Sequence, residues 1–139
     1  ICEDVWHPML PFILAQEGIM YLVVTANSPT RGPRPEGLVI RRVYEEMLAT
    51  YARLFQVYIC FCNRVGYEDG VNFWGGSFVV SPGGDIIARG PKLEAAEVDA
   101  EIVPGEVRRE RMRTPLVGQE NLDLALRELR RIADDRPGH

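Results

Sequence analysis

The sequence predicts an α/β domain with a mixed sheet and helices on one face. Three observations carry this prediction: continuous apolar runs at 21–27 (YLVVTAN) and 57–63 (VYICFCN), and a long amphipathic stretch between them at 36–56. Strands covered on both faces form continuous apolar runs, and a strand–helix–strand unit is suited to a parallel pair. With 139 residues, 46% of them hydrophobic, the chain is long enough for one domain with a core.

The first half of the chain predicts a helix, a strand, a loop and a second helix. PFILAQEGIM predicts a short helix that ends near Gly18, directly before the first strand. The loop at 28–35 is dense in proline and glycine. In the long helix, arginines with Glu45 and Glu46 cover one face, and apolar residues at i, i+3, i+4 and i+7 form the other. These apolar residues are Leu48, Tyr51, Ala52 and Phe55.

The second half predicts three further elements. SFVVSPGGDIIARG predicts a hairpin whose strands are joined by the turn PGGD at 82–85. EVDAEIV at 97–103 alternates, with Val98, Ala100 and Ile102 inward, and predicts a half-buried strand. Residues 119–139 predict an amphipathic helix and a tail at the end of a single domain, 1–139. The apolar stripe of this helix consists of Leu122, Ala125, Leu126, Leu129 and Ile132.

Composition excludes several classes of protein. The net charge of −4 argues against a surface that follows phosphate backbones, so we expect no nucleic-acid partner. No apolar run approaches the ~20 residues of a membrane helix, and we expect neither a membrane partner nor a leader. Three cysteines cannot close a disulfide framework, which favours a reducing, cytoplasmic setting. The basic run at 108–113 alternates with glutamates and predicts a solvated helical face.

Cys2 is the first candidate for chemistry. A thiol at a turn that leads into a helix lies near unpaired amide N–H groups, which stabilise its thiolate and make it a nucleophile. Glu3 places charge beside the sulfur, and Trp6 and His7 supply an aromatic wall with a ring that can bind a polar substrate. A lone cysteine is also commonly a small buried core residue, and that alternative stays open.

The other two cysteines predict core positions. In a strand, Cys60 and Cys62 point to the same face, a spacing also seen in metal sites. A zinc site needs about four ligands, and the histidines are His7 and His139 alone. We therefore expect buried core cysteines and no metal.

Three ordered segments carry a family resemblance: ICEDVWHP, then VVTANSP, then NRVGYEDGVNFWGGSFVVSPGGDIIARG. In this order and at these separations they resemble the C-terminal half of the nitrilase-like carbon–nitrogen hydrolases, over about residues 1–103. Cys followed by Glu-Asp-x-Trp is most similar to the glutaminase-type branch, which includes the amidase domains of glutamine-dependent NAD synthetases.

The resemblance implies an α-β-β-α four-layer sandwich, commonly dimeric. It implies cleavage of a non-peptide amide or nitrile by a Cys nucleophile, a Glu general base and a Lys that stabilises the oxyanion. Cys2 matches the nucleophile. The family's Glu and Lys precede the cysteine, where this sequence has only Ile1, and Lys92, the only lysine, lies beyond the hairpin. We therefore expect a partial domain without its N-terminal half.

The resemblance also implies a small-molecule amide substrate, no cofactor, and a homo-oligomer in the complete protein. Besides Glu3, Trp6 and His7, we expect Asn27 and Ser28 to line the pocket. Glu68 and Asp69 could reach it from the loop after the second strand. In the stretch 63–78, glycines can relieve strand crowding and Ser77 can satisfy a buried amide.

Two other functions stay open. One is a non-catalytic fragment or dimerising module of the same fold, and the other is a thiol redox protein that uses Cys2. A glutamate and a lysine encoded upstream in the parent reading frame would favour the hydrolase.

The two central strands predict a further property. Both are apolar at consecutive positions, so both faces of their sheet need cover, whereas the helices of this chain can cover only one. We expect the other face to be bare or covered by a second copy.

Overall fold

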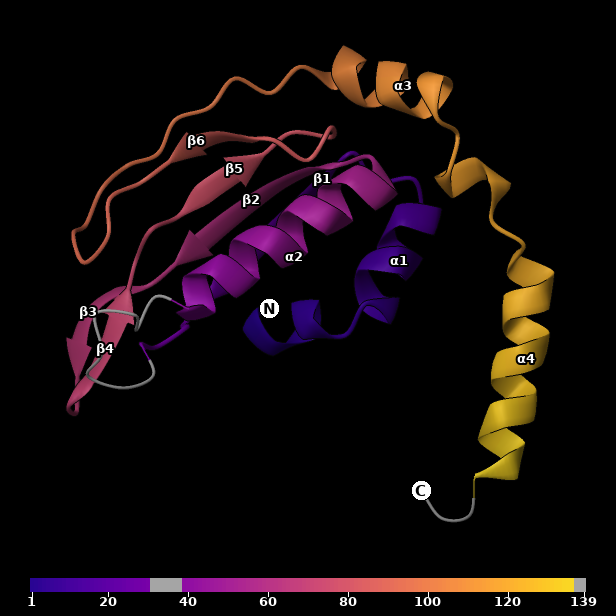
Figure 1. Ribbon diagram of the computed structural model, residues 1–139, viewed down its shortest axis with the longest axis horizontal. Coiled ribbons are helices and arrows are strands. Elements are labelled where there is room, and N and C mark those ends of the chain that lie inside the picture. The colour runs from indigo at the N-terminus through magenta and orange to yellow at the C-terminus, as the bar shows by residue number, and fades with distance from the viewer. Residues whose placement is uncertain (31–38, 137–139) are drawn as a thin grey trace.

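The computed structural model describes residues 1–30 and 39–136, and it shows helices packed against a four-stranded sheet (Figure 1). The strands are β1 (Tyr21–Ala26), β2 (Tyr58–Asn63), β3 (Val65–Glu68), β4 (Val71–Trp74), β5 (Phe78–Val80) and β6 (Ile86–Arg89). The helices are η1 (Cys2–Trp6), α1 (Met9–Gln16), α2 (Val39–Phe55), α3 (Pro104–Arg113), η2 (Val117–Gln119) and α4 (Leu122–Asp135). The predicted α/β class is confirmed.

The larger sheet has the order β1-β2-β5-β6 and is mixed. β1 and β2 are parallel and are connected through α2, whereas β5 is antiparallel to both β2 and β6. The strand–helix–strand unit and the hairpin are therefore as predicted. Arg53 Nε donates to the Gly83 carbonyl at 2.9 Å, which ties the hairpin turn to α2. At Gly84 φ is +86°, and a side chain there would clash with the Ala49 carbonyl.

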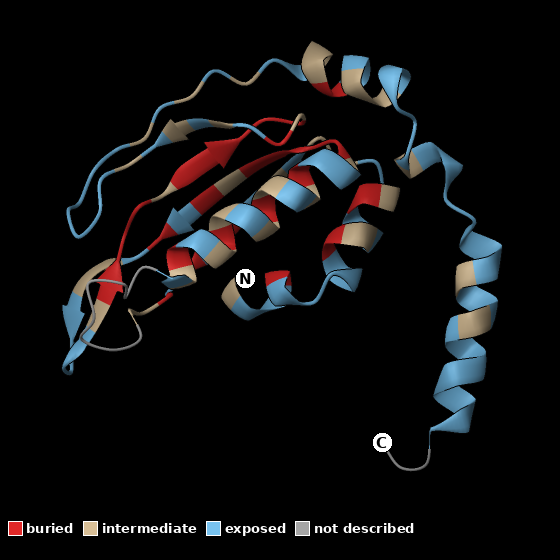
Figure 2. Ribbon diagram, in the orientation of Figure 1, coloured by how far each residue is buried: buried red, intermediate tan, exposed pale blue. Residues whose placement is uncertain are grey.

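The core lies between α2 and the sheet (Figure 2). Leu48 and Ala52 of α2 are fully buried, as the predicted apolar face requires. Across the sheet, the Phe61 ring lies 4.9 Å from Phe78 and 5.8 Å from Trp74, measured between ring centroids. Aromatic rings bury large apolar areas, so this cluster contributes much of the stabilisation of the fold.

One arginine departs from the predicted polar face of α2. Arg41 is 7% exposed, and its Nε lies 2.6 Å from Glu45 Oε1. Glu45 also lies 3.4 Å from Arg89 of β6. The ion pairs explain the burial, because a charged side chain leaves water only when a partner compensates its charge.

The prediction of a strand at 97–103 is wrong. The segment is irregular, although Val98, Ala100 and Ile102 are less exposed than their neighbours, as the alternation requires. Val98 packs close to Gly90, where an added Cβ would lie 2.8 Å from Val98 Cγ2. The alternating pattern therefore reflects the packing of side chains in an extended segment that does not form the backbone hydrogen bonds of a strand.

Three other predictions lie partly outside the described residues. The proline-rich loop at 28–35 is described only to residue 30, and the long helix only from residue 39. The last residues of the predicted tail, 137–139, are outside as well.

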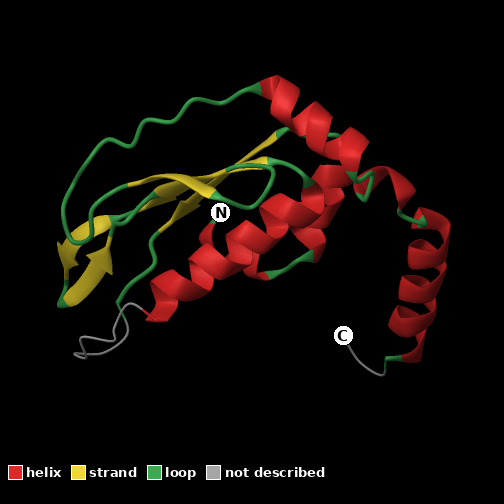
Figure 3. Ribbon diagram, turned by 45° about the horizontal axis from the view of Figure 1, so that its top comes forward, coloured by secondary structure: helices red, strands yellow, loops and turns green. Residues whose placement is uncertain are grey.

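One face of the sheet is bare over β1, as predicted. Tyr21, Val23 and Thr25 are exposed, Val23 to 67%, and alternate with the less exposed Leu22, Val24 and Ala26. Cys62 pairs with Thr25 across β1 and β2 and is also exposed, and Cys60 is only partly buried, so the prediction of two buried core cysteines is wrong. In Figure 3, α1 and α2 lie on one side of the sheet, and the extended segment from β6 to α3 lies on the other.

The C-terminal helix α4 confirms the predicted stripe but leaves it uncovered. α4 extends away from the sheet (Figure 1), and Leu122, Leu126, Leu129 and Ile132 are 39–53% exposed. Among the helices in 1–30 and 39–136, none combines the length and the apolar character needed to cross a membrane.

We expect the chain on its own to self-associate or to bind apolar dyes through the bare face. Burial of about 500 Å² of apolar surface is worth on the order of 12 kcal/mol at ~25 cal/mol/Å², comparable to the stability of a domain. Val23→Lys, at a largely exposed position, should lower light scattering and dye fluorescence. Tyr67→Lys, at a 77% exposed position in the smaller sheet, is the matched control. A compact wild-type monomer that binds no dye would contradict this prediction.

Candidate active site

Cys2 opens the 3-10 helix η1 and packs partly buried against the core. Its φ of +44° is left-handed, a conformation uncommon for a residue other than glycine. Such strain gathers at functional sites, where the surrounding structure enforces it. The predicted helix directly after the cysteine is only this five-residue turn, because α1 begins at Met9. The backbone turn at Cys2, rather than a long helix dipole, is thus the local feature that presents the thiol.

Cys2 lines a hollow of about 390 Å³ on the α2 side of the sheet, which we call the inner hollow. Its lining residues are Cys2, Glu3, Trp6, Asn27, Ser28, Pro29, Ile40 and Tyr44. The structure therefore brings five predicted site residues together, from η1 and from the end of β1. α2 supplies the opposite wall.

Cys2 also lines a second hollow of about 390 Å³, which we call the outer hollow. Its lining residues are Ile1, Cys2, Thr25, Ala26, Asn27, Cys62, Asn63 and Arg64. Thr25 and Cys62 belong to the bare face, so this hollow opens there. Cys2 thus stands between the two hollows, with a core-facing wall on one side and the bare face on the other.

Three predicted residues do not line either hollow. His7 is largely exposed, with its Nε2 3.9 Å from Glu3 Oε1. Glu68 and Asp69 lie at the tip of the β3–β4 hairpin, where Asp69 takes a left-handed turn conformation. Arg64 donates to Glu68 at 2.6 Å and holds the pKa of that carboxyl below its usual value. This ion pair ties Glu68 to Arg64, which itself lines the outer hollow.

Asn63 joins the ends of the two central strands. Its Oδ1 accepts from the Ser28 N–H at 2.9 Å, and its Nδ2 donates to the Gly75 carbonyl at 3.1 Å. Ser28 Oγ in turn accepts from Trp74 Nε1 at 3.1 Å. Ser28 is only 4% exposed, so the role of its hydroxyl is structural: it accepts the buried Trp74 N–H.

The stretch 63–78 has the structural features expected from its glycines and its serine. Ser77 Oγ accepts from the Asn63 N–H at 3.1 Å, so it satisfies a strand amide. Gly75 and Gly76 both have φ of +62°, and an added Cβ at Gly76 would lie 2.9 Å from the Trp74 ring. The Trp74 ring can therefore lie this close to residue 76 only because residue 76 has no side chain.

Tyr44 is a site residue that the sequence analysis missed. Its hydroxyl accepts from Trp6 Nε1 at 3.0 Å, and the two rings meet edge to face with centroids 5.3 Å apart. Burial raises the pKa of the Tyr44 phenol, and the facing Cys2 thiolate charge raises it further. The helix period of the sequence did contain a signal for the burial of Tyr44, because Tyr44 lies one turn before Leu48 on the predicted apolar face.

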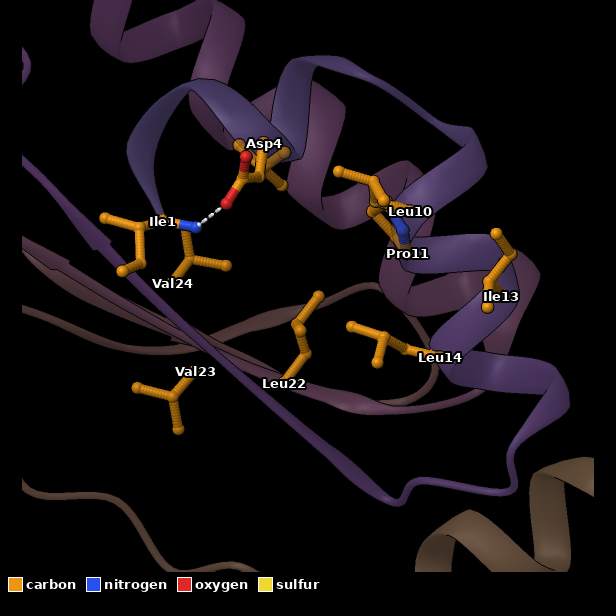
Figure 4. Close-up of a pocket in the computed structure, with 10 residues that line it drawn as sticks. Ile1, Asp4, Leu10, Pro11, Ile13, Leu14, Leu22, Val23 and Val24 are labelled. Atoms are coloured by element: carbon orange, nitrogen blue, oxygen red, sulfur yellow. Dashed lines mark hydrogen bonds and ion pairs between the residues drawn. The ribbon is translucent and has the colours of Figure 1, made fainter.

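An apolar hollow of about 300 Å³ lies between α1 and β1 (Figure 4). Leu22 points toward Leu14 of α1, whereas Val23 points to the other side of β1. Asp4 is the one titratable side chain among its lining residues. This hollow therefore offers apolar contact and no nucleophile.

Within 1–30 and 39–136, His, Cys, Asp and Glu side chains form no group of three that could hold a metal ion. Cys60 and Cys62 point to the same face, as expected from their spacing, and both are free thiols. Burial raises the pKa of the Cys60 thiol, and the charge of Cys62 adds to that effect.

Comparison with known proteins identifies relatives of the chain. Residues 1–112 match the sequence model of the carbon–nitrogen hydrolase family. A glutamine-dependent NAD(+) synthetase of Thermotoga maritima is 34% identical over 96 residues, which cover 68% of this chain and 16% of that protein. An omega-amidase of Escherichia coli is 34% identical over 73 residues, which cover 52% of this chain and 28% of that protein.

A solved structure shares the fold. A carbon–nitrogen hydrolase from Helicobacter pylori G27 superposes with a TM-score of 0.77 at 23% identity, over 88% of this chain and 45% of that one. The chain thus spans less than half of this hydrolase and less than a third of the two curated relatives. The predicted identification as part of a nitrilase-type fold is confirmed.

Ser28→Ala should destabilise the chain by about 1–3 kcal/mol, because it leaves the buried Trp74 N–H without an acceptor. Urea unfolding at fixed protein concentration measures this loss. Adding Trp74→Phe should cost less than the sum of the two single changes, since both remove the same bond. Thr50→Ala, which removes an exposed hydroxyl bonded to the Glu46 carbonyl, is the control, expected within about 0.5 kcal/mol of wild type. Equal effects of Ser28→Ala and Thr50→Ala would contradict the structural role.

Proposed function

The chain belongs to the carbon–nitrogen hydrolase family, and on that basis we propose that it forms part of an enzyme that hydrolyses a non-peptide amide through Cys2. The observation that carries the proposal is the position of Cys2, at a strained turn between two hollows. Trp6 and Asn27 give the inner hollow groups that can contact a polar substrate. Glu3 adds a carboxylate there.

In the proposed reaction, the Cys2 thiolate attacks the amide carbonyl carbon, and the carbonyl π electrons move to oxygen. The backbone N–H of Glu3, next to the nucleophile, helps to hold this oxyanion. Collapse of the tetrahedral intermediate breaks the C–N bond, and ammonia or an amine leaves with a proton. Water then hydrolyses the thioester, releasing the carboxylic acid and restoring the thiol.

The general base and the second oxyanion donor come from elsewhere in the complete protein. The family resemblance assigns these tasks to a Glu and a Lys that precede the cysteine. Glu3 follows the nucleophile directly and does not correspond to that base. Lys92, near Gly75 through a β-bridge, lines neither hollow beside Cys2.

The proposed substrate is a small amide of the kind used by glutaminase-type enzymes. Two observations support this class: the match to a glutamine-dependent NAD(+) synthetase and the match to an omega-amidase. Asn27 faces both hollows and is positioned to contact the substrate from either side. A cytoplasmic location and a homo-oligomer of the complete protein belong to the same proposal.

The alternative is a non-catalytic module of the same fold. One observation favours it: among the described residues that line the hollows beside Cys2, there is no lysine to stabilise an oxyanion. The two functions differ in whether the complete protein turns over an amide.

In the complete parent protein, Cys2→Ala should abolish release of ammonia from glutamine or short aliphatic amides, because no other group replaces the nucleophile. A slow amide substrate should leave a thioester on Cys2, detectable by mass. Cys60→Ala, at a cysteine that lines neither hollow, is the matched control and should keep turnover. Retention of most activity in Cys2→Ala would show that the nucleophile is assigned wrongly.

The 139-residue chain alone should not hydrolyse amides at an enzymatic rate. Loss of the general base removes a factor of about 10²–10⁴, and loss of an oxyanion donor removes roughly another 10²–10³. Purified chain incubated with glutamine tests this by its ammonia release. Normal turnover would mean that these residues contain the full catalytic set.

A further inference from the structure

We propose that Tyr44 is a positioning residue for the nucleophile: its hydroxyl, oriented by Trp6, donates a hydrogen bond to the Cys2 thiolate. The proposal rests on the proposed function in that Cys2 is the reacting thiol. It assigns to a residue of another element, α2, the task of positioning that thiol.

The geometry fixes the phenol oxygen. Tyr44 is 2% exposed and packs between the rings of Trp6 and Phe61, at centroid distances of 5.3 and 4.8 Å. Its oxygen accepts the Trp6 indole N–H at 3.0 Å. Indole N–H is a donor only, so the phenol proton must point to another acceptor.

Cys2 and Ser28 line the inner hollow with Tyr44, so the sulfur of Cys2 and the hydroxyl of Ser28 are the two candidate acceptors for that proton. Ser28 Oγ already accepts from Trp74 Nε1. A thiolate carries a full charge and accepts a stronger hydrogen bond than a neutral hydroxyl does. Burial raises the pKa of Tyr44 most, the Trp6 N–H lowers it, and the charge of Cys2 raises it again, which is consistent with a phenol that faces the thiol.

Tyr44 is therefore more than a packing residue. Packing alone would be served by phenylalanine, and the aromatic cluster around Phe61 already contains two such rings, Phe61 and Phe78. A buried hydroxyl is costly unless it is bonded. The indole of Trp6 satisfies its acceptor side, and the thiolate satisfies its donor side.

The test is the pH dependence of Cys2 alkylation by iodoacetamide, measured on the chain, with peptide mass spectrometry to separate Cys2 from Cys60 and Cys62. Tyr44→Phe should raise the pH of half-maximal alkylation of Cys2 by about 1 unit, since a hydrogen bond to a charged group is worth one to two units of proton affinity. The profiles of Cys60 and Cys62 should not move.

Tyr51→Phe is the matched control. Tyr51 lies on the same helix, and its ring stacks on Phe55 at 5.5 Å, away from Cys2. Other groups that can influence the profile are those beside Cys2 or in its hollows, and they are unchanged in both variants. These groups are the Ile1 ammonium, Glu3, Asp4, His7, Cys62 and Arg64.

An unmoved Cys2 profile in Tyr44→Phe, or an equal shift in Tyr51→Phe, would overturn the proposal. If Tyr44→Phe does not keep the circular dichroism spectrum of wild type, Trp6→Phe is the second test, because it removes the N–H that orients the phenol. Trp6→Phe should raise the pH of half-maximal alkylation of Cys2 by less than Tyr44→Phe is expected to. An unchanged profile of Cys2 in Trp6→Phe would then overturn the proposal.

The proposed function and the proposed role of Tyr44 can be contradicted independently of each other. If the complete protein keeps its activity in Cys2→Ala while Tyr44→Phe still shifts Cys2, the hydrogen bond stands and the nucleophile assignment falls. If Cys2→Ala is inactive and Tyr44→Phe does not shift Cys2, the nucleophile stands and Tyr44 is only a packing residue.

Discussion

The side-chain amide of Asn63 is the constraint on which the candidate site depends. It accepts from the Ser28 backbone beyond β1, donates to the Gly75 carbonyl between β4 and β5, and belongs to the end of β2 itself. Three chain segments that are far apart in sequence are thereby held at one edge of the sheet. In this low-dielectric setting the bonds are strong, and loss of one would leave a buried partner unpaired. Asn27 and the wall of the inner hollow take their positions from this arrangement.

The fold was largely predictable, because its elements have periods that a single sequence displays. The runs at 21–27 and 57–63 gave the parallel pair, and the turn PGGD gave the hairpin. At 97–103 the two-residue period led to the wrong prediction of a strand. Alternating burial also arises when an extended segment packs through its side chains without hydrogen bonds to a neighbouring strand. The helix period misled at Arg41 as well, because the partner that allows its burial, Glu45, is a property of the packed helix.

The candidate site was less predictable. The residues near Cys2 in sequence, and those at the end of β1, could be expected to meet it because strand ends share an edge. Tyr44 could not be assigned from its neighbours, since its role depends on a hydrogen bond to Trp6 across 38 positions. Glu68 and Asp69 were expected to reach the pocket, but they lie at the tip of the β3–β4 hairpin and line neither hollow, a position that the family motif alone does not specify.

The bare face and the outer hollow beside Cys2 share residues. Thr25 and Cys62 are exposed on that face and also line the outer hollow beside Cys2. Any segment that covers the face would therefore form a wall of the outer hollow and bring its own side chains to the thiol. A base and an oxyanion donor on such a segment would approach Cys2 from the side opposite Tyr44. The apolar burial that completes the fold would then also assemble the site, so that stability and catalysis would depend on the same contact surface.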